Sequence, residues 1–104
     1  MSFKAVILLS RRGDMTEEEF RNWWLNDHAP LASQLPGARK IVFNACHDTT
    51  DIDGISELWF DSEADFVAAY ETDLGKRVAA DSLAHVRSRT RMFVTEHAVV
   101  GSAL

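Results

Sequence analysis

The alternation of hydrophobic and polar residues divides the chain into four strands and two helical regions. Residues 3–10 are apolar on both faces, which is typical of a central strand covered on each side. The predicted strands cover residues 3–10, 39–46, 55–60 and 90–100. Helical spacing of apolar residues marks 16–35, and two further helical stretches lie within 62–86. The predicted order of elements is therefore β-α-β-β-α-β.

The first helical region has a clear start and a predicted interruption. Thr16 and Glu19 have the spacing of a capping box, in which each side chain binds the other residue's backbone N–H. One apolar stripe then contains Phe20, Trp24, His28, Leu31 and Leu35. Because Pro30 cannot continue the hydrogen-bond ladder, we expect a kink or short break near residues 27–29.

This order of elements is that of the split βαβ, or ferredoxin-like, unit. Right-handed crossovers in such a unit place both helices on one face of an antiparallel sheet, with the first and third strands central. The sequence contains no internal repeat or linker, so residues 1–104 are expected to form one domain. The other face of the sheet would expose a large apolar patch, which a second copy of the chain could cover.

Charge and hydropathy narrow the possible partners. The 104 residues have a formal net charge of −5, which disfavours binding to nucleic acid. The longest apolar run, residues 5–9, is too short to cross a membrane, and we expect a cytoplasmic protein. Arg87, Arg89 and Arg91 alternate along one stretch, and on a strand they would form a solvated face or the rim of a dimer contact.

The sequence contains no pattern typical of a metal or cofactor site. Cys46 is the only cysteine, and the histidines lack the spacing of metal ligands. Phosphate-binding glycine loops and nucleotide fingerprints are also absent from the sequence. We therefore expect no metal and no cofactor, so any catalysis would be acid–base chemistry by side chains.

Residues 20–32 read F-x-x-W-W-x-x-x-H-x-P-L-A, and L-P-G follows at 35–37. Together with E-L-W-F at 57–60 and M-F-V-T-E at 92–96, this pattern resembles the EthD family of dimeric α+β barrel proteins. The resemblance extends over nearly the entire chain, and the spacing of H-x-P and L-P-G is its most specific part.

The resemblance implies a homodimer in which two sheets face each other, with a pocket in each subunit between sheet and helices. The family is named for an ether-degradation cluster. Its relatives include a muconolactone isomerase and cofactor-independent cyclases, dehydratases and decarboxylases that act on cyclic or aromatic molecules. Because one fold hosts many activities, the resemblance does not choose among these.

His28 is the first candidate for a catalytic residue. An imidazole titrates near neutral pH, so it can take a proton from a carbon acid and return it elsewhere. His28 lies on the stripe expected to face the sheet, beside Trp24 and close to Pro30. The alternative is a structural histidine near a helix end, bonded to a carbonyl group. The match to H-x-P favours the catalytic interpretation.

Glu57 is the second catalytic candidate, because it lies in a predicted central strand and shares a face with Ile55 and Trp59. Its carboxylate could orient His28, or it could act as the base if burial raised its pKa. It could equally form a salt bridge at the dimer contact. The sequence leaves these roles open.

Phe20, Trp24, Leu31 and Trp59 are the expected walls of a pocket for a small apolar organic ligand, although the same residues could simply fill the core. The leading hypothesis is a cofactor-independent acid–base enzyme of the isomerase, cyclase, dehydratase or decarboxylase type. It would act on a small cyclic or aromatic molecule in a degradative or secondary pathway. The alternative is a non-catalytic binding or accessory protein for a neighbouring oxygenase.

Overall fold

The computed structural model of the protein describes residues 3–47 and 51–101. The strands are β1 (Phe3–Arg11), β2 (Lys40–Ala45), β3 (Gly54–Phe60) and β4 (Val86–Val94). The helical segments are α1 (Glu17–Asn22), the π-helix η1 (Trp23–His28), α2 (Ala29–Ala32), α3 (Glu63–Glu71) and α4 (Asp73–His85). The predicted order β-α-β-β-α-β is confirmed. Parts of the predicted 47–54 loop and of the C-terminal tail, residues 48–50 and 102–104, lie outside the described residues.

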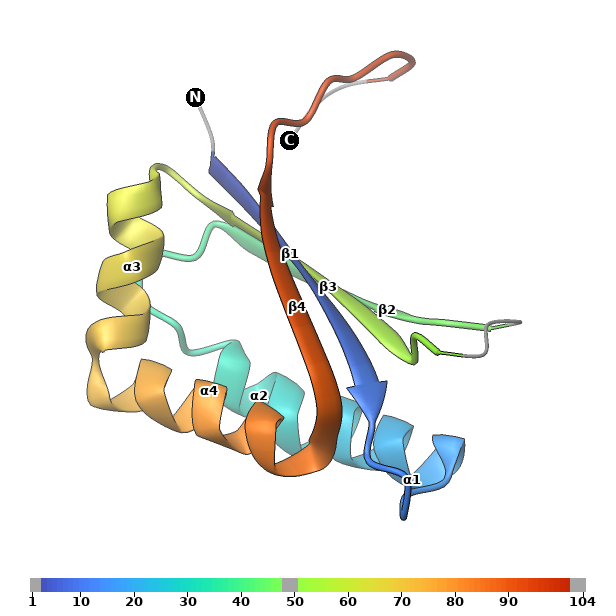
Figure 1. The fold of residues 1–104 in the computed structure, drawn as a ribbon. Helices are drawn as coiled ribbons and strands as arrows, with labels where there is room; N and C mark the ends of the chain where they lie inside the picture. Colours follow the sequence, from blue (N-terminus) through green and yellow to red (C-terminus); the bar gives the residue numbers. More distant parts are fainter. Residues whose placement is uncertain (1–2, 48–50, 102–104) are drawn as a thin grey trace.

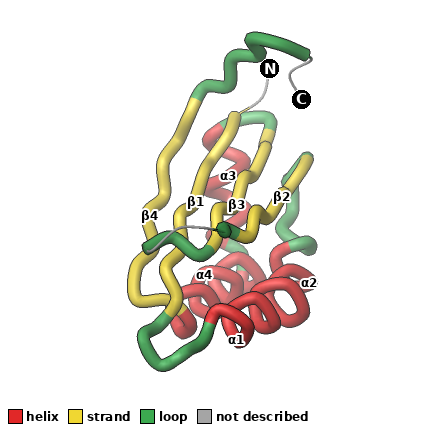
Figure 2. Tube along the Cα trace, turned by 90° about the vertical axis from the view of Figure 1, so that its right-hand side faces the viewer, coloured by secondary structure: helices red, strands yellow, loops and turns green. Residues whose placement is uncertain are grey.

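The four strands form one sheet in the order β2-β3-β1-β4, and every neighbouring pair is antiparallel. β1 and β3 are central, as predicted. All helices lie on the same side of this sheet (Figures 1 and 2). The last strand differs from the prediction, since it spans Val86–Val94 instead of residues 90–100. It begins directly after α4, which ends at His85, so the strand starts four residues earlier than predicted.

Side-chain caps define where the helices start. Thr16 and Glu19 form the predicted capping box, with both hydrogen bonds in place. The Ser62 hydroxyl accepts a hydrogen bond from the Asp65 N–H and starts α3, as expected. Thr72 separates α3 from α4 because its extended backbone ends the first helix while its hydroxyl caps the second.

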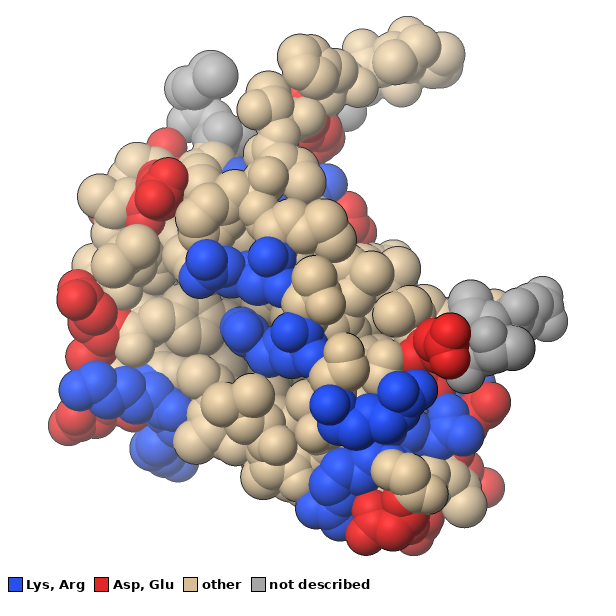
Figure 3. All heavy atoms as spheres, in the orientation of Figure 1, with Lys and Arg blue, Asp and Glu red and all other residues tan. Residues whose placement is uncertain are grey.

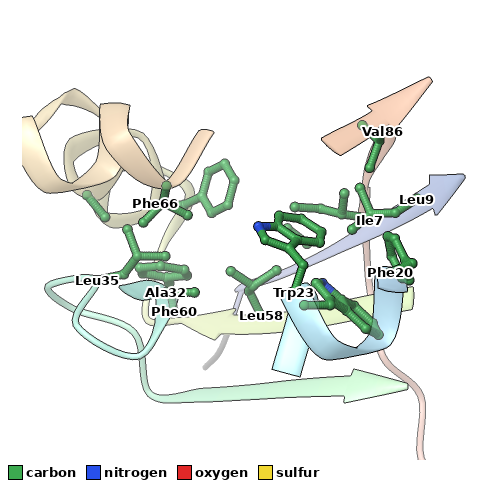
Figure 4. Close-up of a cluster of buried hydrophobic side chains, with 14 residues drawn as sticks. Ile7, Leu9, Phe20, Trp23, Ala32, Leu35, Leu58, Phe60, Phe66 and Val86 are labelled. Carbon is green, nitrogen blue, oxygen red and sulfur yellow. The ribbon is translucent and has the colours of Figure 1, made fainter. Parts of the chain in front are cut away.

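The core lies between the helices and one face of the sheet. Figure 4 shows its labelled side chains in two groups, with Phe60, Phe66, Leu35 and Ala32 at one end and Ile7, Leu9, Phe20 and Trp23 at the other. Leu58 lies between the two groups. The central strands thus hold the aromatic side chains of α1, η1 and α3 in one continuous layer.

The opposite face of the sheet carries the alternate side chains of the same strands and has no helix over it (Figure 2). Its apolar residues are Val6, Leu8, Val42, Ile55, Trp59, Met92 and Val94. We call this surface the outer face. None of the helices within the described ranges is long and apolar enough to cross a lipid bilayer.

The close approach of Trp24 to β3 gives a test of this packing. A Cβ atom added at Gly54 would lie 2.6–2.9 Å from carbons of the Trp24 ring, and that ring is already stacked on Phe43 at 4.5 Å. We expect Gly54→Ala to lower the free energy of unfolding by about 1–3 kcal/mol through overpacking. Urea denaturation measures the change.

Gly13→Ala is the matched control, because nothing lies within 4 Å of a Cβ atom at that exposed turn. Its effect should stay within about 0.5 kcal/mol. Equal stability of the two variants would show that Trp24 does not occupy the described position.

Candidate functional site

The helical region between β1 and β2 changes geometry one turn before Pro30. Proline has no backbone N–H, and its ring clashes with the carbonyl four residues earlier, so a regular α-helix cannot run through this position. The chain adopts a π-helix over Trp23–His28, after which the Ala29 N–H donates to the Trp24 carbonyl, five residues back. The interruption predicted near residues 27–29 is thus a π-helical segment that ends there.

The π-helix brings Trp23 and His28 onto one side. In an α-helix, residues five apart are rotated by roughly 140° from each other. The i to i+5 geometry of a π-helix removes most of that rotation. The Trp23 Nε1 and the His28 Nδ1 lie 3.2 and 2.8 Å from the same oxygen, Oδ2 of Asp81 in α4. Two ring donors therefore converge on one carboxylate.

Asp81 determines which nitrogen of His28 carries the proton. A carboxylate only accepts hydrogen bonds, so Nδ1 is the protonated nitrogen in the neutral ring. The lone pair of Nε2 then points towards the Ser82 hydroxyl, at 3.3 Å. Because the His28 residue is only 4% exposed, this arrangement is shielded from water. The ring is held in the tautomer that can accept a proton at Nε2.

Burial and charge act on His28 in opposite directions. Burial lowers the pKa of the imidazole, whereas the hydrogen bond and the charge of Asp81 raise it. Electrostatic interactions with His85 and Arg89 also lower this pKa, and the net direction is below the ordinary value. His28 is therefore neutral near pH 7 and available as a proton acceptor.

A second histidine packs against the outside of this cluster. The His85 ring stacks on Trp23, with ring centres 4.2 Å apart and planes 14° from parallel. Its Nδ1 lies 2.7 Å from the backbone carbonyl of Asp81 and donates to it. Trp23, His28 and His85 thus surround Asp81 and fix its position on α4.

His28 borders a small internal cavity between the helices and the sheet. The cavity has a volume of about 20 Å³, which is room for about one water molecule. Its polar lining consists of His28, Ser56, Tyr70, Ser82 and Arg89. The remaining lining is apolar and comes from the strands, α2 and α4. A substrate larger than water does not fit here unless side chains move.

A larger hollow lies on the other side of Tyr70, Ala79 and Arg89, which line both spaces. It has a volume of about 300 Å³ and lies between β4 and the helices α3 and α4. Figure 3 shows a depression in this area, with Lys and Arg side chains beside it along β4. Another hollow, of about 260 Å³, is lined by Leu25 and Phe43 among others.

Phe20 and Trp24, two of the predicted pocket walls, lie in the core. Their exposed fractions are 1% and 0%, and neither lines the cavity beside His28. Leu31, the third predicted wall from this helix, is half-buried and packs against the core. Ala32 reaches the cavity in its place. The predicted stripe is buried, but its aromatic rings fill space instead of leaving it open.

Glu57 and Trp59 lie on the outer face, away from His28. The Glu57 carboxylate is 2.8 Å from the Lys4 ammonium and accepts a hydrogen bond from Asn44. These contacts lower the pKa of Glu57, the Lys4 hydrogen bond most strongly. The Trp59 ring lies beneath the Lys4 ammonium at 4.4 Å. The carboxylate that contacts His28 is therefore Asp81, and Glu57 belongs to the face that the helices leave uncovered.

The sequence analysis did not identify the following residues as part of the site: Trp23, Ser56, Tyr70, Asp81, Ser82 and Arg89. Trp23 does not fall on the stripe that a regular helical period gives, and the π-helix brings it to the side of His28. Asp81 and His85 have the i, i+4 spacing of neighbours on a helix, which was the one local signal available. Within the described part of the chain, no group of three or more His, Cys, Asp or Glu residues is arranged to hold a metal ion.

An antiparallel sheet covered on one side by helices, with a buried histidine–aspartate pair between the two layers, defines a ferredoxin-like α+β domain with a candidate acid–base site. Residues 12–86 match the EthD domain. This match covers more than half of the chain, so the protein belongs to the EthD family. The resemblance noted in the sequence is thereby confirmed. No curated protein matches the sequence.

Several solved structures share the fold. An EthD family protein from Bacillus halodurans has a TM-score of 0.82 at 24% identity, with 93% of this chain and 100% of that one covered. A dimeric ferredoxin-like protein from Thermobifida fusca has a TM-score of 0.75 at 14% identity, with 92% of each chain covered. A hydroxynitrile lyase from Passiflora edulis has a TM-score of 0.76 at 9% identity, with 96% of this chain and 97% of that one covered. At these identities the likeness establishes the fold alone.

The lowered pKa of His28 predicts a loss of stability in acid. Because the unfolded chain binds this proton more tightly than the folded one, the unfolding free energy should fall as pH drops below about 6.5. Above that pH both states are neutral at this site. Urea unfolding at about pH 7.5 and about pH 5.5 should show a smaller decrease for His28→Gln than for wild type.

His97→Gln is the matched control, since His97 lies in the exposed segment after β4. This variant should keep the wild-type pH dependence. If His28→Gln also kept it, the assignment of a depressed pKa to His28 would be refuted.

Proposed function

We propose that this protein is a cytoplasmic homodimer of single EthD-like domains (residues 1–104) that catalyses cofactor-independent acid–base chemistry. It would act on a small cyclic or aromatic molecule in a degradative or secondary pathway, as an isomerase, cyclase, dehydratase or decarboxylase. The observation that carries the proposal is the His28–Asp81 pair, which holds a neutral imidazole at the border of a cavity.

His28 is the proposed general base and acid. With Nδ1 bound to Asp81, the basic Nε2 can take a proton from a carbon next to a carbonyl group and return it to a different atom. The imidazolium formed in between would be stabilised by the Asp81 carboxylate. Asp81 is thus a positioning residue. It orients His28, a role that the sequence analysis considered for Glu57.

Two features support this role for the site. A buried titratable group with a shifted pKa and a specific charged partner is characteristic of functional sites. The neighbour from Passiflora edulis, described as a hydroxynitrile lyase, has the same fold. The shared fold supports the reaction class by analogy and does not indicate a particular substrate.

The substrate would enter from the 300 Å³ hollow, whose volume is at the lower end for small-molecule pockets. Tyr70 and Arg89 separate this hollow from the cavity at His28, so their movement would admit the reacting part of the molecule. Phe20, Trp24 and Leu31 would act indirectly, because they hold the helix that carries His28.

A deuterium-exchange experiment tests the catalytic proposal. Cyclohex-2-enone and 2(5H)-furanone, two small carbon acids, would be incubated with the protein in D₂O, and proton NMR would follow the loss of C–H signal. We expect exchange catalysed by wild type, and a decrease of about 100-fold or more in His28→Gln, because a general base typically supplies that factor.

Asp27→Asn is the control, because Asp27 is the exposed neighbour of His28 in sequence and lines neither space. This variant should exchange like wild type. Equal exchange rates for wild type and His28→Gln would exclude His28 as the base.

The proposed homodimer uses the outer face. Met92 and Val94 are 39% and 37% exposed there, and they adjoin the half-buried Val6. Lys4 and Glu57 form an ion pair on the same face, so burial in a dimer would not leave either charge alone. Trp59, beneath Lys4, would lie at this contact. The neighbour from Thermobifida fusca is described as dimeric.

Met92→Lys should convert the protein from dimer to monomer, because it places an unpaired charge in an apolar contact. Sedimentation velocity measures the change. Leu83→Lys is the matched control, since Leu83 is 63% exposed on α4, and α4 lies on the side of the sheet opposite the outer face (Figure 2). Dissociation by the Leu83 variant and not by the Met92 variant would assign the contact to the helices.

One observation favours the alternative of a non-catalytic binding or accessory protein for a neighbouring oxygenase. Both ring nitrogens of His28 already have protein partners, and the cavity beside it holds about one water molecule. Under this alternative, ligands would bind in the 300 Å³ hollow and leave unchanged, without deuterium exchange. The exchange experiment therefore separates the two functions.

A further inference from the structure

Arg89 and Arg91 on β4 lie on the helix-covered face of the sheet, where Arg89 is half-buried and Arg91 is exposed. Their strand partners are Leu9 and Ile7, whose side chains lie in the core beneath the helices. The expectation of a solvated or dimer-rim face for the arginine cluster is therefore wrong for Arg89. Arg87 and Arg91 are exposed as expected, and Arg87 lies near Asp51.

Neither Arg89 nor Arg91 has a carboxylate within 4.0 Å among the described residues. Arg11, by contrast, pairs with Asp53, and Arg39 pairs with Asp61. Arg91 lies over the Phe93 ring, with its guanidinium carbon 4.4 Å from the ring centre. Arg89 is half-buried, and burial lowers its pKa. A half-buried guanidinium without an anion is costly, so a bound anion would be favourable here.

Both arginines line the 300 Å³ hollow, together with Phe66, Tyr70 and Glu71. Two arginines and one glutamate leave this hollow with a net charge of +1, which matches a single carboxylate better than a dianion. The aromatic rings provide a surface for a planar or cyclic body. The hollow thus combines a cationic end with an apolar wall.

The hollow adjoins the site of His28, because the two spaces share lining residues. Arg89, Tyr70 and Ala79 border both the hollow and the cavity that His28 borders. A molecule whose anionic group is bound by the arginines would therefore lie next to the partition that separates it from the imidazole. Arg89, which would bind the anionic group, also borders the cavity beside the His28 imidazole.

We propose that Arg89 and Arg91 bind the carboxylate of a small cyclic or aromatic monocarboxylic acid, whose ring packs against Phe66 and Tyr70. This inference rests on the proposed function, since it defines the substrate class of that site. Arg89 and Arg91 are substrate-binding residues, and His28 remains the group that moves the proton. Guanidinium groups suit this role because they bind carboxylates with two parallel hydrogen bonds.

Binding of benzoate, followed by NMR titration of backbone amides, tests the proposal, with benzamide as the neutral probe of the same shape. We expect benzoate to shift the amides of Tyr70, Ala79 and Arg89 and to bind at least about tenfold more tightly than benzamide. Arg89→Gln and Arg91→Gln should each weaken benzoate binding by about tenfold and leave benzamide unaffected. Arg87→Gln, on the same strand outside the hollow, should bind like wild type.

The inference would be overturned if benzoate did not bind, or if it bound no better than benzamide. It would also be overturned if benzoate bound equally to wild type and to both arginine variants. Because Arg91 is exposed, Arg91→Gln keeps the test valid if Arg89→Gln does not fold. His28→Gln should still bind benzoate. Arginine-dependent benzoate binding without His28-dependent exchange would reject the enzyme and keep the acid-binding site. His28-dependent exchange without arginine-dependent benzoate binding would keep the enzyme and reject the acid-binding site.

Discussion

Pro30 imposes the constraint on which the candidate site depends. Because a proline ring excludes a regular α-helical bond to the residue four positions earlier, the turn before it widens into a π-helix. That widening turns Trp23 and His28 to the same side, where both reach Asp81. Without it, the two rings would point in different directions, and the carboxylate would bind one of them alone. The helix interruption therefore assembles the only buried histidine–carboxylate pair among the described residues.

The electrostatic balance of this pair follows from where it is placed. Full burial alone would lower the pKa of His28 further, and a fully exposed pair with Asp81 would raise it. Asp81 is half-buried, and its carboxylate orients an imidazole that water hardly reaches. The two faces of the sheet consequently have different roles. The helix-covered face holds the titratable cluster and the two arginines, and the outer face holds an apolar surface around one ion pair.

Much of the fold could be predicted because its signals are local. Capping residues such as Thr16 and Ser62 lie within three residues of the N–H groups that they bind. The apolar run of β1 indicates a central strand whatever its neighbours are, and the element order restricts the topology to very few arrangements. For the site, the same reasoning found His28 from its place on a buried stripe. It also predicted a break in the helix beside Pro30, although not its π-helical form.

The sequence by itself thus determined the strands, the helix caps, the family and one functional candidate, since each depends on neighbouring residues or on periodicity. Only the tertiary structure decided which carboxylate meets His28, because Asp81 is 53 positions away and comes close through the packing of α4 on η1. It also decided that Glu57 lies on the outer face, and that Arg89 borders the cavity. A strand pattern shows which residues share a face, but only the packed helices determine which face becomes the interior.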